Sequence, residues 1–234
     1  MQYPQIQRII GILLMLFSTS MLPAAGVGLY YNEPAMNAFL SGFAITMVAG
    51  ALIWYPVHGR RNELRTRDGY LITVLFWLVL GLFGAVPLWL LEMPDLSVAD
   101  AVFESFSGLT TTGATVITGL DTLPRALLYY RQQLQWFGGM GIIVLAVAIL
   151  PMLACALAYW AAGMDLFNAI GHSFSTVAIG GFSTHDASIG YYNSPLIEGI
   201  CILFMLISGI NFALHFLAWR FRSLKNYWQD PECR

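Results

Sequence analysis

The chain has 234 residues, of which 58% are hydrophobic and 10% are charged, and its formal net charge is -2. Its mean hydropathy is +0.67, whereas about a quarter of the residues of an ordinary soluble domain carry charge. No basic stretch is interleaved with aromatic residues, which excludes nucleic-acid binding. Cys155, Cys201 and Cys233 have no spacing that indicates a disulfide framework or a metal site.

Three long apolar segments come first: Ile9 to Tyr31, Met36 to Trp54 and Tyr70 to Leu91. Each has about the 20 residues that a helix needs to cross a bilayer, and together they predict an all-α integral membrane protein in a lipid bilayer. The first segment could instead be a signal peptide, because Arg8 precedes it and small residues lie near its end. Its continuation to Tyr31 favours a retained span.

The loop after the second apolar segment fixes the expected orientation. It carries four arginines, Arg60, Arg61, Arg65 and Arg67. Because positive residues are enriched in cytoplasmic loops, this loop is expected inside and the segment from Glu92 to Ser97 outside.

A short amphipathic stretch, Val98 to Leu109, precedes the polar tract Thr110 to Thr115. Together they are too short and too polar to span, and non-helical backbone at membrane depth survives only where protein or water shields it. The pattern therefore predicts a re-entrant loop. The apolar segment from Ala126 to Leu150 follows as a fourth span.

The sequence repeats itself at an offset of 68 residues, which matches Asn168–Ser175 to Asp100–Ser107 and places Gly181 opposite Gly113. The second copy includes the tract Ala178 to Ser183 and is followed by a last apolar segment. We therefore expect repeated units of helix, re-entrant pore loop and helix, as in potassium channels, after an N-terminal two-helix unit.

Both tracts suit a filter that binds a cation through backbone carbonyl oxygens. Such a filter replaces the hydration shell of potassium, and it needs extended backbone, small or hydroxyl side chains and a conformationally free glycine. A single Thr/Gly tract is more typical of close helix packing, but two tracts in register favour a filter. The candidate potassium-binding residues are Thr111, Thr112, Gly113, Ile179, Gly180 and Gly181.

Three longer motifs are Phe103 to Thr115, Arg131 to Gly141 and Ala178 to Ala187. Together they resemble the Trk-type potassium uptake subunits of the TrkH/TrkG family, over essentially the whole chain. The resemblance implies four loop-and-helix repeats around one pore and potassium as the substrate, with no covalent cofactor and no enzymatic reaction. It also implies the bacterial inner membrane and a cytosolic nucleotide-binding regulatory subunit similar to TrkA.

The chain departs from that family because it has two repeats and lacks a segment near Pro151. The apolar stretch from Leu134 to Gly163 would be a helix about 45 Å long, at about 1.5 Å per residue, which fits one crossing but not two. The return helix after Pro151 is therefore expected to be abnormally short. The expected units are residues 1–57 (two-helix unit), 58–153 (first pore-loop repeat) and 154–234 (incomplete second repeat).

Two rival hypotheses remain beside potassium uptake: a non-conducting remnant, and an accessory membrane protein that associates with a full-length relative. A conducting form is expected to be a homo-oligomer, because one chain supplies only two of four filter segments.

Other residues have two interpretations each. Ser173 or Ser183 beside a histidine lacks the Gly-x-Ser-x-Gly setting of a serine hydrolase, so catalysis is not expected. Glu104 could tune the potential of the pore entrance or bond to neighbouring backbone. Gly138 and Gly139 could be bends or gating points below the filter, or close packing points, and Tyr130 is expected among the interfacial aromatics.

Overall fold

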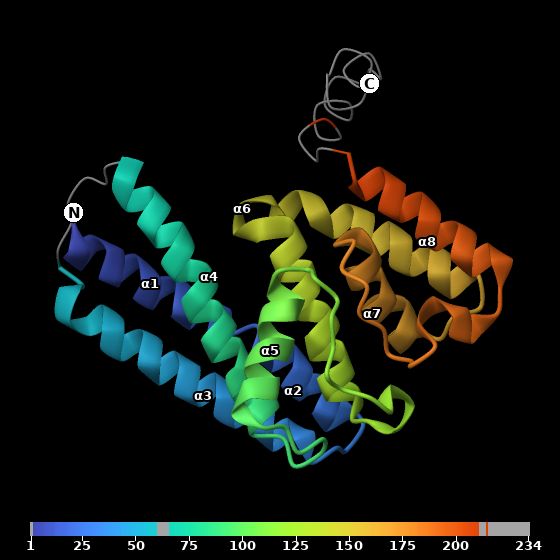
Figure 1. Ribbon diagram of the computed structural model, residues 1–234, viewed down its shortest axis with the longest axis horizontal. Helices are drawn as coiled ribbons and strands as arrows, with labels where there is room; N and C mark the ends of the chain where they lie inside the picture. The colour runs from blue at the N-terminus through green and yellow to red at the C-terminus, as the bar shows by residue number, and fades with distance from the viewer. Residues whose placement is uncertain (1, 60–65, 211–213, 215–234) are drawn as a thin grey trace. The chain divides into compact units, whose positions relative to one another are not determined.

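The computed structural model describes residues 2–59, 66–210 and 214 (Figure 1). Its α-helices are α1 (Tyr3–Ser18), α2 (Met21–Tyr30), α3 (Ala35–Trp54), α4 (Thr66–Trp89), α5 (Val98–Leu109), α6 (Arg125–Ala161), α7 (Leu166–Val177) and α8 (Pro195–Ser208). Short 3-10 helices are η1 (Tyr55–Val57), η2 (Leu120–Thr122) and η3 (Ser188–Tyr192). No β-strand occurs within these ranges, and the all-α prediction is confirmed.

Three helical stretches of the described chain are long and apolar enough to cross a membrane: Tyr3–Tyr30, Ala35–Val57 and Arg67–Trp89. They coincide with the first three predicted spans. The first is divided into α1 and α2 at Thr19 and Ser20. Pro23 explains this break, because its ring has no N–H and clashes with the carbonyl four residues before it.

Parts of two predicted features lie outside the described residues. These are most of the arginine loop, from Arg60 to Arg65, and most of the last span beyond α8. The described part of that span, Pro195–Ser208, is a short apolar helix.

The chain divides into two compact units. The first comprises Met1–Phe106, Thr115–Ile117 and Thr122–Tyr130, and the second comprises Ser107–Ala114, Thr118–Asp121 and Arg131–Arg234. Consequently, α5 and α6 each contribute residues to both units.

In the first unit, α1 packs against α3 and α4, and α3 also packs against α2 and α4 (Figure 1). Glycines permit this close approach. A Cβ atom at Gly11 would lie 2.8 Å from the Cβ of Trp54, and one at Gly42 would lie 2.9 Å from the Cβ of Pro87. Small residues at such crossings are typical of membrane helices, whose association depends on close packing.

Tyr130 corrects one sequence-based expectation. Its ring is fully buried in the first unit and lies 5.1 Å from the ring of Phe39, and its hydroxyl donates a hydrogen bond to the carbonyl of Gly84 at 3.1 Å. A buried tyrosine is tolerated when its hydroxyl has a partner. Tyr130 is therefore a core residue rather than an interfacial one.

Helix α6 differs from the two helices expected in this region. It runs for 37 residues and includes Pro151 in its interior, so no loop separates a fourth span from a return helix. Figure 1 shows α6 bending, with its second half beside α7 and α8.

The second half of α6 is attached to α7 by a buried hydrogen bond between hydroxyl groups. The hydroxyl oxygens of Tyr159 and Thr176 lie 2.8 Å apart. This bond holds the α6 segment against the helix that leads into the second Thr/Gly tract.

Candidate ion-coordinating site

The candidate site consists of two backbone segments that follow helices of equal length, and we name them filter segments after the function predicted for them from the sequence. The first filter segment, Thr110 to Thr115, follows α5, and the second filter segment, Ala178 to Ser183, follows α7. Both helices begin in the same way. The Ser97 hydroxyl accepts a hydrogen bond from the N–H three residues later at 3.2 Å, and the Asp165 carboxylate, 68 residues further on, does the same at 3.2 Å. Such caps satisfy an orphan N–H at a helix N-terminus.

The end of α5 is closed by backbone hydrogen bonds. The N–H of Thr111 donates to the carbonyl of Gly108 at 3.0 Å, and that of Thr112 donates to Ser107 at 3.0 Å. These bonds satisfy carbonyls that would otherwise be unpaired at the helix end.

The end of α7 repeats this arrangement. The N–H of Ile179 donates to the carbonyl of Thr176 at 3.1 Å, and that of Gly180 donates to Ser175 at 2.8 Å. All four residues lie 68 positions after their counterparts at the end of α5. The internal repeat inferred from the sequence is therefore also a repeat of hydrogen bonds.

The two filter segments also share an unusual backbone. The φ angle is +54° at Thr111 and +74° at Gly113, and it is +53° at Ile179 and +85° at Gly181. Positive φ is uncommon for residues other than glycine, and for a β-branched residue it is a genuine outlier. Outliers of this kind cluster at ligand-binding sites.

The structure brings two of the predicted site residues close together. A Cβ atom at Gly113 would lie 2.3 Å from the carbonyl oxygen of Gly180, so only glycine fits at position 113. The two filter segments are therefore neighbours within the second unit.

The residues that follow the two filter segments are also joined to each other by hydrogen bonds. The N–H of Gly119 donates to the Asp186 carboxylate at 3.1 Å, and His185 Nδ1 bonds to the carboxylate of Asp121. The hydrogen bond from His185 holds the pKa of Asp121 below its ordinary value. The chain stretches that follow the two filter segments are therefore held together within the second unit.

Glu104 is a buried acid on α5, in the first unit. Its two carboxylate oxygens each lie 3.0 Å from the hydroxyl of Thr115, and one accepts from the N–H of Val116 at 3.3 Å. Of the two interpretations of Glu104, the structure supports the one in which its carboxylate bonds to neighbouring residues of the same chain, Thr115 and Val116.

No group of three or more His, Cys, Asp or Glu side chains in the described part of the chain could hold a metal ion. The two segments themselves carry backbone carbonyls and the hydroxyls of threonine and serine side chains.

Comparison with known proteins identifies the family. The family model of the cation transport protein TrkH matches residues 35–154 and 152–234. The chain belongs to the TrkH family.

Two relatives are potassium uptake proteins called TrkH. The protein of Halomonas elongata is 54% identical over 275 residues, and that of Escherichia coli K12 is 50% identical over 275 residues. Each alignment covers 100% of this chain and 57% of the relative. The crystal structure of the potassium transporter TrkH from Vibrio parahaemolyticus matches with a TM-score of 0.93 and 52% identity, over 100% of this chain and 56% of that chain.

The chain thus spans little more than half the length of these TrkH relatives. The alignments of 275 residues are also longer than the chain, so the relatives contain residues that are missing here. The two matches of the family model meet at residues 152–154. This position agrees with the missing segment predicted near Pro151.

Two glycines of the TrkH-like motif after the first filter segment serve close packing. A Cβ atom at Gly138 would lie 1.8 Å from the carbonyl oxygen of Leu109, and one at Gly139 would lie 2.8 Å from the Cβ of Ala178. Helix α6 thus contacts the ends of both short helices, which supports the packing interpretation of these glycines.

Sequence reasoning missed Gln135, which lies in the same motif and bonds to the second filter segment. A signal was available, because Gln132, Gln133 and Gln135 are amides at the start of an apolar helix, and polar residues at membrane depth are often functional.

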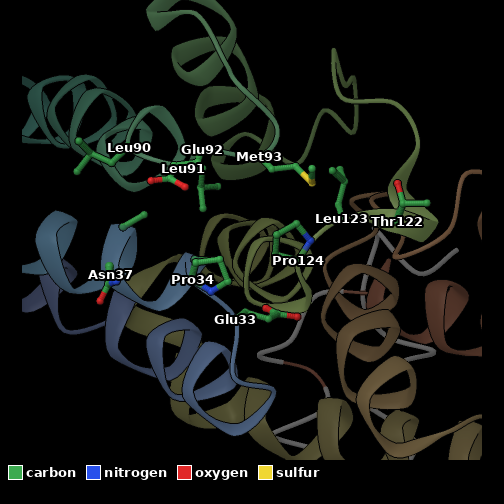
Figure 2. A pocket seen from close by; sticks show the side chains of 12 residues that line it. Glu33, Pro34, Asn37, Leu90, Leu91, Glu92, Met93, Thr122, Leu123 and Pro124 are labelled. Carbon is green, nitrogen blue, oxygen red and sulfur yellow. The ribbon is translucent and has the colours of Figure 1, made fainter.

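The first unit also contains a pocket of about 610 Å³, whose lining residues appear in Figure 2. One of them, Glu33, accepts hydrogen bonds from the N–H groups of Arg125 at 2.9 Å and Ala126 at 3.0 Å. A carboxylate is stabilised at the N-terminus of a helix by unpaired N–H groups and by the helix dipole. Glu33 therefore fixes the start of α6.

Proposed function

We propose that this chain is a Trk-type potassium uptake subunit that contributes two ion-coordinating segments to a filter. Its proposed ligands are the backbone carbonyls of Thr111, Thr112, Gly113, Ile179, Gly180 and Gly181. The observation that carries the proposal is the repeated backbone, with positive φ at Thr111, Gly113, Ile179 and Gly181. The family of the chain and the potassium uptake by its relatives agree with this function.

The proposed active form is a homodimer. Removing water from a cation without replacing its ligands is costly, and a filter made of four segments would be half complete in one chain. Two copies supply four segments. The close approach of Gly113 to the carbonyl of Gly180 supports this form, because it places the two segments of one copy beside each other.

The remaining assignments of the proposal follow the family. The chain lies in the bacterial inner membrane, with its arginine loop in the cytoplasm, where a nucleotide-binding regulatory subunit can bind. Residues 1–57 form the N-terminal two-helix unit, residues 58–153 the first repeat, and residues 154–234 the incomplete second repeat.

A second candidate is an accessory membrane protein that does not conduct by itself and associates with a full-length relative. One observation favours it: α6 runs without a break from Arg125 to Ala161, where two separate membrane crossings joined by a loop were expected. Purification of the tagged chain from cells that contain a full-length relative separates the two candidates. The accessory function requires that the two proteins purify together.

Growth on limiting potassium tests the leading proposal. Bacteria that lack their own potassium uptake systems should grow at low potassium when they express this chain, and they should not grow when they express Gly113→Val at the same membrane level. Failure of the unchanged chain to support growth, despite normal membrane insertion, would contradict potassium uptake.

A further inference from the structure

We propose that Gln135 is a positioning residue for the second filter segment, because its side-chain amide holds the peptide groups on both sides of Gly181. This role rests on the proposed function, since it concerns the same filter. It connects the helix that follows the first filter segment to the backbone of the second.

The geometry is bidentate and buried. Gln135 is 0% exposed. Its Nε2 donates to the carbonyl of Gly180 at 2.7 Å, and its Oε1 accepts from the N–H of Phe182 at 2.9 Å. The side chain thus pairs with the second filter segment as a neighbouring strand would.

An amide is the side chain that fits this position. One contact requires a donor and the other an acceptor, and a neutral amide supplies both at a fixed separation. A carboxylate would face the carbonyl oxygen of Gly180 without a proton to donate, and an apolar side chain would leave a buried N–H and a buried carbonyl unpaired. Each group left unpaired carries the full cost of its lost hydration.

Gly181 is the reason that such support is needed. Its φ angle is +85°, and a Cβ atom at this position would have no neighbour within 4 Å among the described residues. Glycine has the greatest backbone freedom of all residues. The two hydrogen bonds of Gln135 therefore fix the direction of the carbonyls that flank Gly181.

The bond to Gly180 is compatible with ion coordination. A carbonyl oxygen has two lone pairs, so the oxygen of Gly180 can accept from Gln135 and still face a cation. Loss of the amide would leave this oxygen free to rotate, and selectivity depends on the number and placement of such oxygens.

A second contact from the same face of α6 supports the assignment. Arg131, one turn before Gln135, is buried, and its guanidinium carbon lies 4.3 Å from the centre of the Phe182 ring. Residues four apart share a helix face. This face of α6 therefore holds both the backbone and the side chain of Phe182.

Gln132 is a matched control on the same helix. It is also 0% exposed, and neither its Oε1 nor its Nε2 has a hydrogen-bond partner among the described residues. Replacement of an unpaired buried amide by an apolar side chain of similar shape is nearly neutral or stabilising. Gln132→Met and Gln135→Met therefore make the same chemical change and differ only in the bonds lost.

The two hydrogen bonds from Gln135 to Gly180 and Phe182, here called the clamp, can be tested by hydrogen exchange. This test does not require the chain to conduct ions. The purified chain is labelled with ¹⁵N-phenylalanine, and the Phe182 signal is assigned with Phe182→Leu. In the unchanged chain the Phe182 N–H should be protected although it lies outside a helix. Gln135→Met should speed its exchange about tenfold, whereas Gln132→Met should leave it unchanged. An unprotected Phe182 N–H in the unchanged chain would overturn the clamp, and so would equal exchange in the two variants.

Ion selectivity tests the consequence for the filter. In liposomes, Gln135→Met should lower the ratio of potassium to sodium flux several-fold, and Gln132→Met should not. A conducting Gln135→Met protein with an unchanged ratio would overturn the positioning role. The unchanged chain could fail to conduct while Gln135→Met, and not Gln132→Met, speeds exchange of the Phe182 N–H. That result would contradict the proposed function and would leave the positioning role of Gln135 standing. If Gln135→Met does not fold, Gln135→Asn gives the same comparison, because an amide one methylene shorter cannot reach both Gly180 and Phe182.

Discussion

The Nε2 atom of His172 lies 3.0 Å from the hydroxyl of Ser183, eleven residues further along the chain. Its Nδ1 lies 2.9 Å from the carbonyl of Asn168, so the neutral ring donates to that carbonyl and accepts from Ser183. The Glu104–Thr115 bond has the same spacing of eleven residues. Both pairs connect a short helix to the end of its filter segment, with an acid in one repeat and a histidine in the other.

Removal of Glu104 tests the importance of this connection for stability. Glu104→Leu should lower the free energy of unfolding by about 1–3 kcal/mol, because the N–H of Val116 loses its acceptor and the hydroxyl of Thr115 keeps only the longer 3.4 Å bond to the carbonyl of Ile117. Urea unfolding in detergent micelles measures the change. Glu92→Leu, at an exposed position, is the control and should change stability by no more than about 0.5 kcal/mol. Equal losses in the two variants would contradict the connection.

Two glycines of the filter segments provide a matched pair of substitutions. Both have positive φ, but a Cβ atom at Gly113 would collide with the Gly180 carbonyl, whereas one at Gly181 would meet none of the described residues within 4 Å. Gly181→Ala should lower the free energy of unfolding by only about 1–2 kcal/mol, through backbone strain. Gly113→Ala should lower it by more and should also reduce potassium selectivity. Thermal unfolding and flux ratios measure these effects. A milder effect at position 113 than at position 181 would contradict the close approach of the segments.

The carboxylate of Asp121 should make the stability of the fold depend on pH in the acid range. Its pKa is lowered by the hydrogen bond from His185, so the carboxylate stabilises the fold above its ordinary pKa, and this contribution disappears as the pH falls through the lowered value. His185 is also flanked by Tyr191 and His172, and Asp186 is adjacent in the chain. When unfolding is measured from pH 6 to pH 2, the free energy of unfolding should fall less for Asp121→Asn than for the unchanged chain. Asp95→Asn, in an exposed loop, should behave like the unchanged chain, and identical pH profiles for all three proteins would rule out this contribution.

The orientation of the chain predicts a labelling pattern. After replacement of the native cysteines by serine, a membrane-impermeant thiol reagent should label Ser97→Cys in intact cells and should not label Asn62→Cys. The reason is the preference of arginine-rich loops for the cytoplasm. Permeabilised cells, in which both sites should react, serve as the control. Labelling of Asn62→Cys alone in intact cells would reverse the topology.

The spans and the repeat could be predicted from the sequence because they depend on local properties. The length of an apolar run determines whether it can cross a bilayer, and the spacing between Gly113 and Gly181 is visible in the sequence itself. The caps at Ser97 and Asp165 also act within one turn.

The contacts of Gln135 and Tyr130 could not be predicted in this way. The amide of Gln135 bonds to residues 45 and 47 positions away, and the hydroxyl of Tyr130 reaches a carbonyl 46 positions away. Such bonds depend on the path of the whole chain. For the same reason, the continuity of α6 through Pro151 was not expected, because a proline inside a helix favours a break or a kink and only packing decides between them.

Potassium flux into liposomes that contain only the purified chain tests the central claim most directly, with the number of copies per liposome varied by dilution. If each copy contributes two of four filter segments, selective potassium flux should be absent from liposomes with one copy and should rise with the square of protein density when copies are few. Gly113→Val, reconstituted in parallel, should give no selective flux at any density. Selective flux proportional to the amount of protein would contradict the need for two copies, and the absence of flux at high density would contradict potassium uptake by this chain.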